Sequence, residues 1–535
     1  MEENGIIVAG TVWSLIPIIV TMLVVFLTKK IKMALFCGIL TAAFLVSNFS
    51  LQRAVIATED AIIGVFLQHQ NLFGVLSRWY VGIILFIMAL GIITSFVIVT
   101  GGAKAFVNYM SARVSTRRGV QYLNVVLGIL LMIDDYFNAL INGNIGTLLA
   151  DKHKLSRTRV SYTVDSIAAP ICIIAPVSSW AVAIMGNITT VYGQIGLEGR
   201  DVMIDFFRLM PYHFYVFSAI GLVLITITFD WNMKAMARYE EHLKETGIDL
   251  SAEESEEMNV DKTTDKGTLA DFFIPILTLV VATVGTMFIT GAQNMSAEDF
   301  AARGVFAILG NWALSMSLYV GGICGAAAAF WRGNVAVKAG NITEEQYWGA
   351  AKLGVKSMVG ASIILIFAWT IASLIGQLQV GEFAGNVFYA LGLGITFIPF
   401  VMFILAAILA FSIGTSWGTF AIGLPIAGGV VAHLDPSLSM LFPAMSAVLS
   451  GAVFGDHASP ISDTTILSAT GARCGTFDHF VTQLPYALLA AAIAGIGYLG
   501  FGIAGGNLLV GYIFFAVAIG AVAFLVAVKT RSQRA

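Results

Sequence analysis

Charged residues are scarce in this sequence: Asp, Glu, Lys and Arg make up 11% of its 535 residues, whereas hydrophobic residues make up 58%. Soluble domains carry about 25% charged residues, so this composition lies far outside the soluble range. The formal net charge of −3 is too small to indicate nucleic acid or an acidic partner. We therefore expect an all-α polytopic membrane protein.

Cysteine is equally sparse. The four cysteines are scattered, and no two stand at the spacing of metal ligands. The sequence also lacks a phosphate-binding loop, a His-Glu-x-x-His motif and a Cys/His cluster, which argues against an ATP-driven pump or a metalloprotease. The match of residues 414–418 to the hydrolase pattern Gly-x-Ser-x-Gly is weak, because no strand pattern surrounds it. No cofactor and no enzymatic activity are expected.

Long apolar runs dominate instead, and a helix needs about 20 such residues to span a bilayer. Lys29, Lys30 and Lys32 follow the first run, and Lys529 and Arg531 follow the last, so the positive-inside rule predicts an outside N-terminus and a cytoplasmic C-terminus. About eleven transmembrane helices are expected, at residues 9–28, 33–48, 80–101, 160–187, 212–229, 272–290, 307–330, 357–375, 446–471, 485–499 and 508–528.

Two further segments fit poorly as single spans. Residues 119–151 are mostly apolar but contain several polar residues, and a basic residue stands at each end, Arg118 before the segment and Lys152 after it. Residues 392–432 lie in a stretch too long for one helix, with a polar tip near residues 414–419. Both are predicted to be re-entrant hairpins, whose tips must be covered by protein or line a cavity.

The order of spans and hairpins repeats with opposite orientation, as in secondary transporters with inverted repeats. The first repeat covers residues 1–231, with a broken helix at about 160–187, and the second covers residues 271–505, with a broken helix at about 440–471. An acidic cytoplasmic linker, expected to be mobile, occupies residues 232–270, and an extra helix with a basic tail occupies residues 506–535. The related tetrads at residues 176–179 and 460–463 are a weak internal match.

The strongest functional signal is residues 446–471, where Asp456 and Asp463 stand in apolar sequence. An ionisable group at membrane depth costs about 2.5–3.5 kcal/mol, so such residues usually have a function. Pro460 should break the helix and free carbonyl oxygens beside the carboxylates. Oxygen ligands suit a hard cation such as Na⁺. The alternative is that both aspartates only cap the two half-helices. The candidate ion ligands are Asp456, Ser459, Ser462, Asp463, Thr464 and Thr465.

Other polar residues are candidates for the same region. Asp456, Asp463 and His457 could carry a proton, although a structural role for the histidine is equally open. Asp134 and Asp135 could instead end a short span, and Asp165 could lie at the membrane interface. His153 and His479 are expected to be solvated. The first-repeat candidates are Asp134, Asp135, Asn138, Asn142, Asp165, Ser178 and Ser179, and the second hairpin adds Thr415, Ser416 and Thr419.

Three motifs carry a family resemblance: GDHASPISDTT at residues 455–465, IDDYFN at 133–138 and GTSWGT at 414–419. The chain resembles the NhaC family of sodium/proton antiporters over both halves. The resemblance implies a carrier of the bacterial inner membrane that exchanges Na⁺ for H⁺, in a group where elevator motions are common. Its partners would be lipid, Na⁺ and H⁺, with a second copy forming a homodimer. The alternative is Na⁺-coupled symport or exchange of a small organic acid or amino acid, with Asn138, Asn142, Ser178, Ser179, Thr415 and Ser416 as substrate donors.

Overall fold

The computed structural model describes residues 6–28, 30–66, 79–111, 113–114, 116–132, 135–176, 178–197, 200, 202–252, 264–296, 298, 308, 311–379, 383 and 394–532. Apart from an isolated bridge between Ala252 and Cys474, these residues form helices and their connections. The expected all-helical class is confirmed for this part of the chain.

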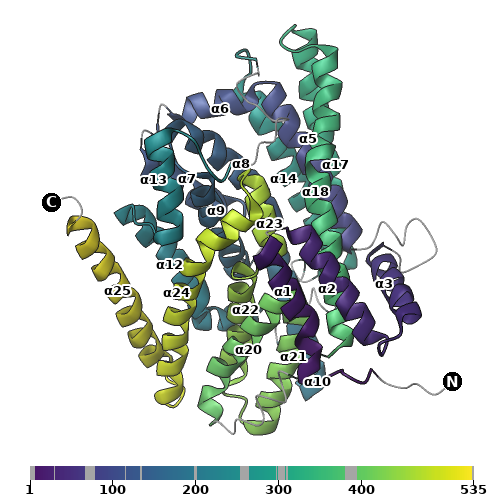
Figure 1. The fold of residues 1–535 in the computed structure, drawn as a ribbon, viewed down its shortest axis with the longest axis vertical. Helices are drawn as coiled ribbons and strands as arrows, with labels where there is room; N and C mark the ends of the chain where they lie inside the picture. The colour runs from purple at the N-terminus through teal and green to yellow at the C-terminus, as the bar shows by residue number, and fades with distance from the viewer. Residues whose placement is uncertain are drawn as a thin grey trace.

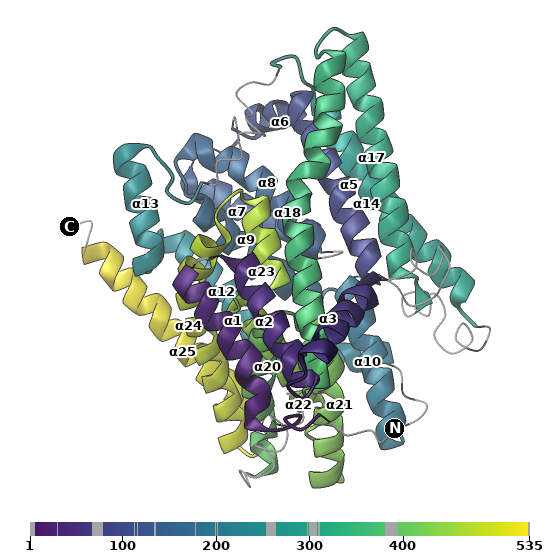
Figure 2. The ribbon, with the colours of Figure 1, turned by 45° about the vertical axis from the view of Figure 1, so that its right-hand side comes forward.

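The helices pack in two groups, which lie side by side in Figures 1 and 2. In the first group, α17 and α18 extend beyond the rest of the molecule at one end (Figure 1), and α18 packs along α2, α3 and α5. Its members are α1 (Ile16–Thr28), α2 (Ile31–Val46), α3 (Leu51–Phe66), α5 (Trp79–Val99), α6 (Gly102–Ser111), α14 (Leu269–Asn294), α17 (Leu314–Lys338) and α18 (Glu344–Gln377).

The second group contains the predicted hairpins and broken helices, and α24 and α25 form its outer edge (Figure 2). Its first-half members are α7 (Arg117–Leu130), α8 (Asp135–His153), α9 (Arg157–Ile174), α10 (Ser179–Ile195), α11 (Val202–Leu209), α12 (Phe214–Phe229) and α13 (Lys234–Thr246). Its second-half members are α20 (Ile398–Ile413), α21 (Ser416–Leu434), α22 (Leu441–His457), α23 (Asp463–Gly471), α24 (Thr476–Ile503) and α25 (Leu508–Ser532).

Within the described residues, five helices are long and apolar enough to cross a membrane singly, or six if the pair formed by α2 and α3, bent by 120°, counts as one. They are Phe214–Thr246, Leu269–Asn294, Ile395–Ile413, Thr476–Ile503 and Leu508–Arg531. Four of them coincide with predicted spans, and Ile395–Ile413 is the first arm of the predicted second hairpin. The other hairpin arms and the halves of the broken helices are not among these five, and several of them are short: α7 has 14 residues, α22 has 17 and α23 has 9.

The hairpins and broken helices pack in a reciprocal pattern. The first arm of each hairpin lies against the first half of the broken helix that follows it in sequence, α7 on α9 and α20 on α22. The second arms cross over, since α8 packs on α23 and α21 packs on α10. The α8–α23 approach is so close that a Cβ on Gly143 would lie 2.8 Å from the backbone carbon of Gly471. The candidate site is therefore assembled from both halves of the sequence.

The expectation of a mobile linker is wrong for its first part. Residues Lys234–Thr246 form helix α13, which docks on the second group through buried Met236 and Leu243. Glu240, only 1% exposed, accepts a hydrogen bond of 2.8 Å from the backbone N–H of Ser156 and pairs with Arg117. A buried carboxylate is stabilised by such partners, which a count of linker charges does not reveal. Residues 253–263 lie outside the described part.

Candidate functional site

The candidate site forms where α22 ends at His457 and α23 begins at Asp463. Pro460 lies in the break, as predicted, and Ser462 is the N-cap of α23, accepting a hydrogen bond of 3.3 Å from the N–H of Thr465. An N-cap serine stabilises a helix by about 1 kcal/mol. The hydroxyl of Ser459 donates to the carbonyl of Phe411 on α20 at 2.8 Å and ties the break to the second hairpin.

The tip of the second hairpin meets this break. Gly414 ends α20 in the left-handed region, with φ of 75°, and a Cβ there would lie 2.8 Å from the carbonyl oxygen of Ile461. Its own carbonyl accepts a hydrogen bond of 3.3 Å from the N–H of Asp463. A glycine fits this position because it alone adopts positive φ at little cost and allows so close an approach.

Asp456 lies at the end of α22 with no exposed surface. One carboxylate oxygen accepts a hydrogen bond of 2.5 Å from Ser462, and the other accepts one of 2.9 Å from Ser416, the first residue of α21. Ser462 therefore has two roles, since the same hydroxyl caps α23 and binds Asp456. The contact with Ser416 joins the carboxylate to the predicted polar tip of the second hairpin.

Asp463 opens α23 and is 1% exposed. Its carboxylate accepts hydrogen bonds from the hydroxyl of Tyr136 at 2.5 Å and from the N–H of Thr464 at 2.9 Å. Tyr136 lies on α8, so the first hairpin does reach the second broken helix. Among the described residues, neither Asp463 nor Asp456 forms an ion pair with Lys or Arg. Hydroxyl groups and a backbone amide hold both carboxylates.

The first-repeat candidates divide between several environments. Asp134 lies outside the described residues, and Asp135 is buried at the first turn of α8 beside Tyr136. Asn138 and Asn142 hold the hairpin itself together: they donate to the carbonyls of Gly128 at 2.7 Å and Asn124 at 2.9 Å on α7. The sequence suggests that these two asparagines could donate hydrogen bonds to a substrate. In the structure, their amide groups donate within the hairpin instead.

The remaining candidates lie at the helix ends around the two breaks. Ser178 caps α10, accepting a hydrogen bond of 3.0 Å from the N–H of Ala181, in the role that Ser462 has for α23. The side chain of Ser179 lies outside the described part. Thr464 contacts Ser462 at 3.0 Å between hydroxyl oxygens, and Thr419 donates to the carbonyl of Thr415 at 3.0 Å. The hydroxyl groups of Ser462, Thr464 and Thr419 thus lie at the second break and at the second hairpin tip.

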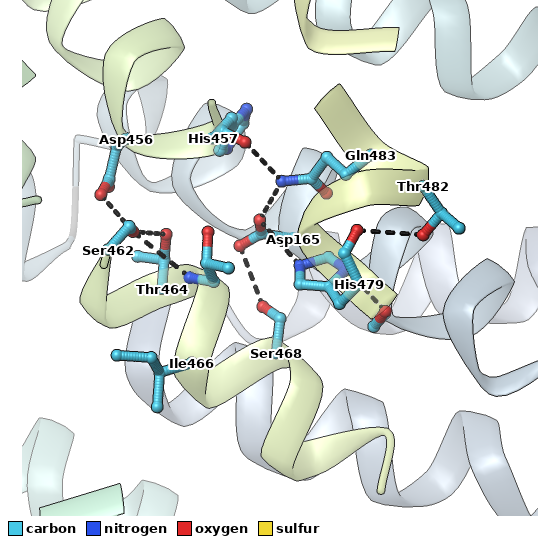
Figure 3. A network of polar contacts seen from close by, with 12 residues as sticks. Asp165, Asp456, His457, Ser462, Thr464, Ile466, Ser468, His479, Thr482 and Gln483 are labelled. Atoms are coloured by element: carbon cyan, nitrogen blue, oxygen red, sulfur yellow. Dashed lines mark hydrogen bonds and ion pairs between the residues drawn. The ribbon is translucent and has the colours of Figure 1, made fainter. Parts of the chain in front are cut away.

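A second polar cluster lies directly beside the break (Figure 3). Its centre is Asp165 on α9, which is completely buried. Its carboxylate accepts a hydrogen bond of 2.9 Å from Ser468 on α23, pairs with the Nε2 atom of His479 at 3.3 Å and accepts another bond from Gln483. Asp165 is therefore enclosed by protein, unlike a solvated acid at the start of a helix.

His479 corrects a second expectation. The sequence predicts a solvated side chain, yet His479 has no exposed surface, because α24 packs against α9 and α13. Sequence reasoning also omitted Gln483, Ser468 and Tyr136. The available signal was their polarity within apolar helices, but their partners are distant in the sequence.

His457 connects the two clusters. Its Nδ1 atom lies 3.0 Å from the hydroxyl of Tyr215 on α12, and its backbone carbonyl accepts a hydrogen bond of 3.0 Å from Gln483. Figure 3 shows His457 between Asp456 and Gln483. The imidazole is 1% exposed, so it is integrated into the packing of the break rather than open to solvent.

A helix break with buried carboxylates beside a hairpin tip is an arrangement typical of secondary membrane transporters. The model of the Na⁺/H⁺ antiporter family matches residues 171–503. The chain therefore belongs to this family of secondary transporters and is a multi-pass membrane protein.

Three curated proteins are similar in sequence to this chain. An uncharacterized protein of Haemophilus influenzae is 34% identical over 98% of this chain and 96% of its own length. The malate-2H⁺/Na⁺-lactate antiporter of Bacillus subtilis is 31% identical over 27% of this chain and 30% of its own. The arginine/ornithine antiporter ArcD of Halobacterium salinarum is 30% identical over 21% of this chain and 23% of its own.

Among solved structures, the YdaH transporter of Alcanivorax borkumensis matches with a TM-score of 0.41 and 13% identity, covering 92% of this chain and 99% of that one.

Proposed function

We propose that this protein is a Na⁺/H⁺ antiporter that binds both ions at Asp456 and Asp463. The observation that carries the proposal is the set of partners of these two buried carboxylates. They accept hydrogen bonds from Ser416, Ser462 and Tyr136, which are neutral donors. Hydroxyl groups can turn their lone pairs toward a cation, whereas a permanent ion pair with Lys or Arg would already neutralise the site.

Competition between the two ions follows from electrostatics. Desolvation disfavours a pair of ionised carboxylates with no cation nearby, so either a proton or Na⁺ must compensate the charge. Na⁺ would take oxygen ligands from Asp456, Asp463 and the hydroxyls of Ser462 and Thr464, with Thr465 and Ser459 next to them. Release of Na⁺ leaves the carboxylates ready to accept a proton, and exchange is the consequence.

The proposed architecture consists of two inverted repeats, residues 1–231 and 271–505, with about eleven spans. It is supported by the reciprocal packing of hairpins and broken helices and by the matching caps Ser178 and Ser462. Alternating access would move the second helix group, which holds the site, against the first. The proposal also includes a homodimer in the bacterial inner membrane, with the N-terminus outside and the C-terminus in the cytoplasm.

Single-cysteine labelling tests the topology. Cysteines placed near Arg113 and Lys154, on either side of the first hairpin, should both react with an impermeant reagent from the cytoplasmic face. Cysteines near Glu382 and Asp435 should both react from outside. Labelling of the first pair from opposite faces would turn the hairpin into a span and remove the inverted repeat.

The second candidate function is Na⁺-coupled exchange or symport of a small organic acid or amino acid. The matches to antiporters of malate and lactate and of arginine and ornithine favour it, although each covers less than a third of this chain. The side chain of Ser416, together with Thr415 and Thr419 near the second hairpin tip, would supply substrate contacts. Asn138 and Asn142 are weaker candidates, because their amide groups already bind α7.

Transport in everted vesicles separates the two candidates. Vesicles that generate an internal acid pH, monitored with a pH-sensitive dye, should lose part of the pH gradient when Na⁺ is added. Vesicles from cells without the protein give the baseline. If Na⁺ leaves the dye signal unchanged while a radiolabelled organic acid or amino acid is transported in a Na⁺-dependent way, the second candidate replaces the first.

A further inference from the structure

The pair formed by Asp165 and His479 lies outside the set of proposed Na⁺ ligands, and nothing in the antiport scheme above uses it. Both side chains are fully buried, on α9 and α24, and the His479 Nε2 atom is 3.3 Å from the Asp165 carboxylate. Burying two ionisable groups in a membrane protein is costly, and such groups commonly mark proton pathways. Their position beside the break therefore calls for a role in the transport cycle.

The hydrogen bonds around His479 suit both protonation states of its ring. The Nδ1 atom lies 2.7 Å from the hydroxyl oxygen of Ser161, which is itself 3.1 Å from the carbonyl of Thr158. When the ring is neutral, Nε2–H donates to Asp165 and Ser161 donates to Nδ1. When the ring is protonated, Nδ1–H donates to Ser161, whose hydroxyl turns to donate to Thr158. A rotation of one hydroxyl thus accommodates the proton.

Two side chains connect this pair to the proposed cation site. Ser468 donates to Asp165 at 2.9 Å from α23, five residues after Asp463, or about 7.5 Å along the helix. Gln483 donates both to Asp165 and to the carbonyl of His457, which follows Asp456 directly (Figure 3). A change of charge at Asp165 and His479 therefore acts on both sides of the break.

We infer that Asp165 and His479 form a proton-binding site, separate from the Na⁺ ligands, which contributes one of the protons exchanged for Na⁺. This inference rests on the proposed antiport function and specifies where part of its proton is held. The step is a proton transfer alone: the Nδ1 lone pair of His479 gains a proton that comes ultimately from solvent as Na⁺ leaves, and this proton returns to solvent when Na⁺ binds. Asp165 stays ionised and stabilises the imidazolium.

Other titratable groups surround the pair, but Asp165 bonds the ring directly. Three nearby arginines are directed to other partners: Arg157 to Asp151, Arg159 to Gln121 and Arg473 to Asn144. The facing groups are Asp456 and His457 on α22, Asp463 on α23, Cys474 after α23, Tyr215 on α12, and Asp478, which lies on α24 and binds Tyr239 of α13. Na⁺ that binds while Asp456 and Asp463 are ionised adds a positive charge, and this charge favours release of the proton from His479.

The test counts the protons released when Na⁺ binds to the purified full-length protein. Calorimetric titrations with NaCl, in buffers of different ionisation enthalpy from about pH 5.5 to about pH 8.5, span the ordinary titration range of histidine. In His479→Gln the number released should fall by up to one near neutral pH, while Na⁺ still binds. His213→Gln is the matched control, because His213 is equally buried and bonded to a serine, Ser446, at 2.8 Å. It should release as many protons as the wild type.

Ser161→Ala provides a second variant in case His479→Gln does not fold. Loss of this hydroxyl leaves Nδ1–H of the protonated ring without its acceptor, so fewer protons should be released when Na⁺ binds. Unchanged proton release in His479→Gln, or in Ser161→Ala if only that variant folds, overturns the inference and leaves the antiport proposal intact. A wild-type protein that binds Na⁺ without releasing any proton overturns the antiport proposal itself.

Discussion

Replacing Asp456 by Asn tests the centre of the proposed site without disturbing its shape. The amide keeps one oxygen to accept from Ser462 and gains an N–H₂ group that faces Ser416. Ser416 has a second acceptor, the carbonyl of Ala452 at 3.2 Å, so its hydroxyl can turn away and accept from the new amide. Removing the charge also relieves the cost of burying a carboxylate at membrane depth, about 2.5–3.5 kcal/mol. The variant should fold and be at least as stable as the wild type.

Its loss of Na⁺ binding should be large. A carboxylate and Na⁺ about 4 Å apart at an effective dielectric constant of about 20 attract by about 4 kcal/mol. Because each 1.4 kcal/mol is tenfold in affinity, Asp456→Asn should weaken Na⁺ binding by about a thousandfold. Dye-monitored proton movement in everted vesicles should then show no response to Na⁺ at concentrations that saturate the wild type.

Asp435→Asn is the matched control. Asp435 is also buried, at 3% exposure, but binds Ser437, Ser439 and the N–H of Met440 at the end of α21. This substitution should lower the unfolding temperature and leave the Na⁺ dependence of exchange unchanged. If Asp456→Asn and Asp463→Asn both retained wild-type Na⁺ dependence, the assignment of the cation site to this break would be wrong. The site would then have to be sought near Asp135.

Three further variants test the supporting structure. Glu240→Gln removes the charge that holds α13, and should lower the free energy of unfolding by about 1–3 kcal/mol; an unchanged unfolding temperature would contradict the docking of this helix. Gly414→Ala places a Cβ against the break at a residue in the left-handed region, at a conformational cost of about 1–2 kcal/mol, and should reduce the rate of exchange. Gly429→Ala is the control, because its added Cβ meets no atom within 4 Å, and it should have little effect. Equal exchange rates in the two variants would refute the close contact at Gly414. On α11, outside the candidate spans, burial alone would raise the pKa of Asp205, but hydrogen bonds from Arg200 and other partners hold this pKa below its ordinary value. A carboxylate with a lowered pKa contributes stability that is complete above about pH 5 and is lost as the pH falls through the folded-state pKa. The difference in unfolding temperature between the wild type and Asp205→Asn should therefore shrink with acidification. A constant difference would argue against the ion pair.

The broken helix could be predicted from the sequence because its signals are local. Pro460, Ser462 and two aspartates within an apolar run specify a helix end, a cap and a buried charge in a few residues. The hairpin tip at Gly414 was equally local. Such features need no knowledge of which other helices lie nearby.

The second polar cluster could not be predicted because its partners are remote. Asp165 and His479 are 314 positions apart, and His479 near a helix start has the same local pattern as a solvated residue. Asn138 and Asn142 illustrate the converse difficulty. An amide in an apolar helix can serve a substrate or the neighbouring helix, and only the position of α7 decides between the two.

The contacts of Glu240 restrict how the site can move. One carboxylate binds Arg117, at the start of the first hairpin, and the backbone N–H of Ser156, at the start of the first broken helix. Asp249, a few residues further on, accepts a hydrogen bond of 2.7 Å from the N–H of Arg157. Independent rotation of α7 and α9 at this end would break these buried bonds. The two helices should therefore move together as one rigid body. The segment that connects the two halves of the sequence therefore holds α7 and α9 together through Glu240 and Asp249. A change in its charge would alter how these two helices move, although it lies far from the proposed ion site.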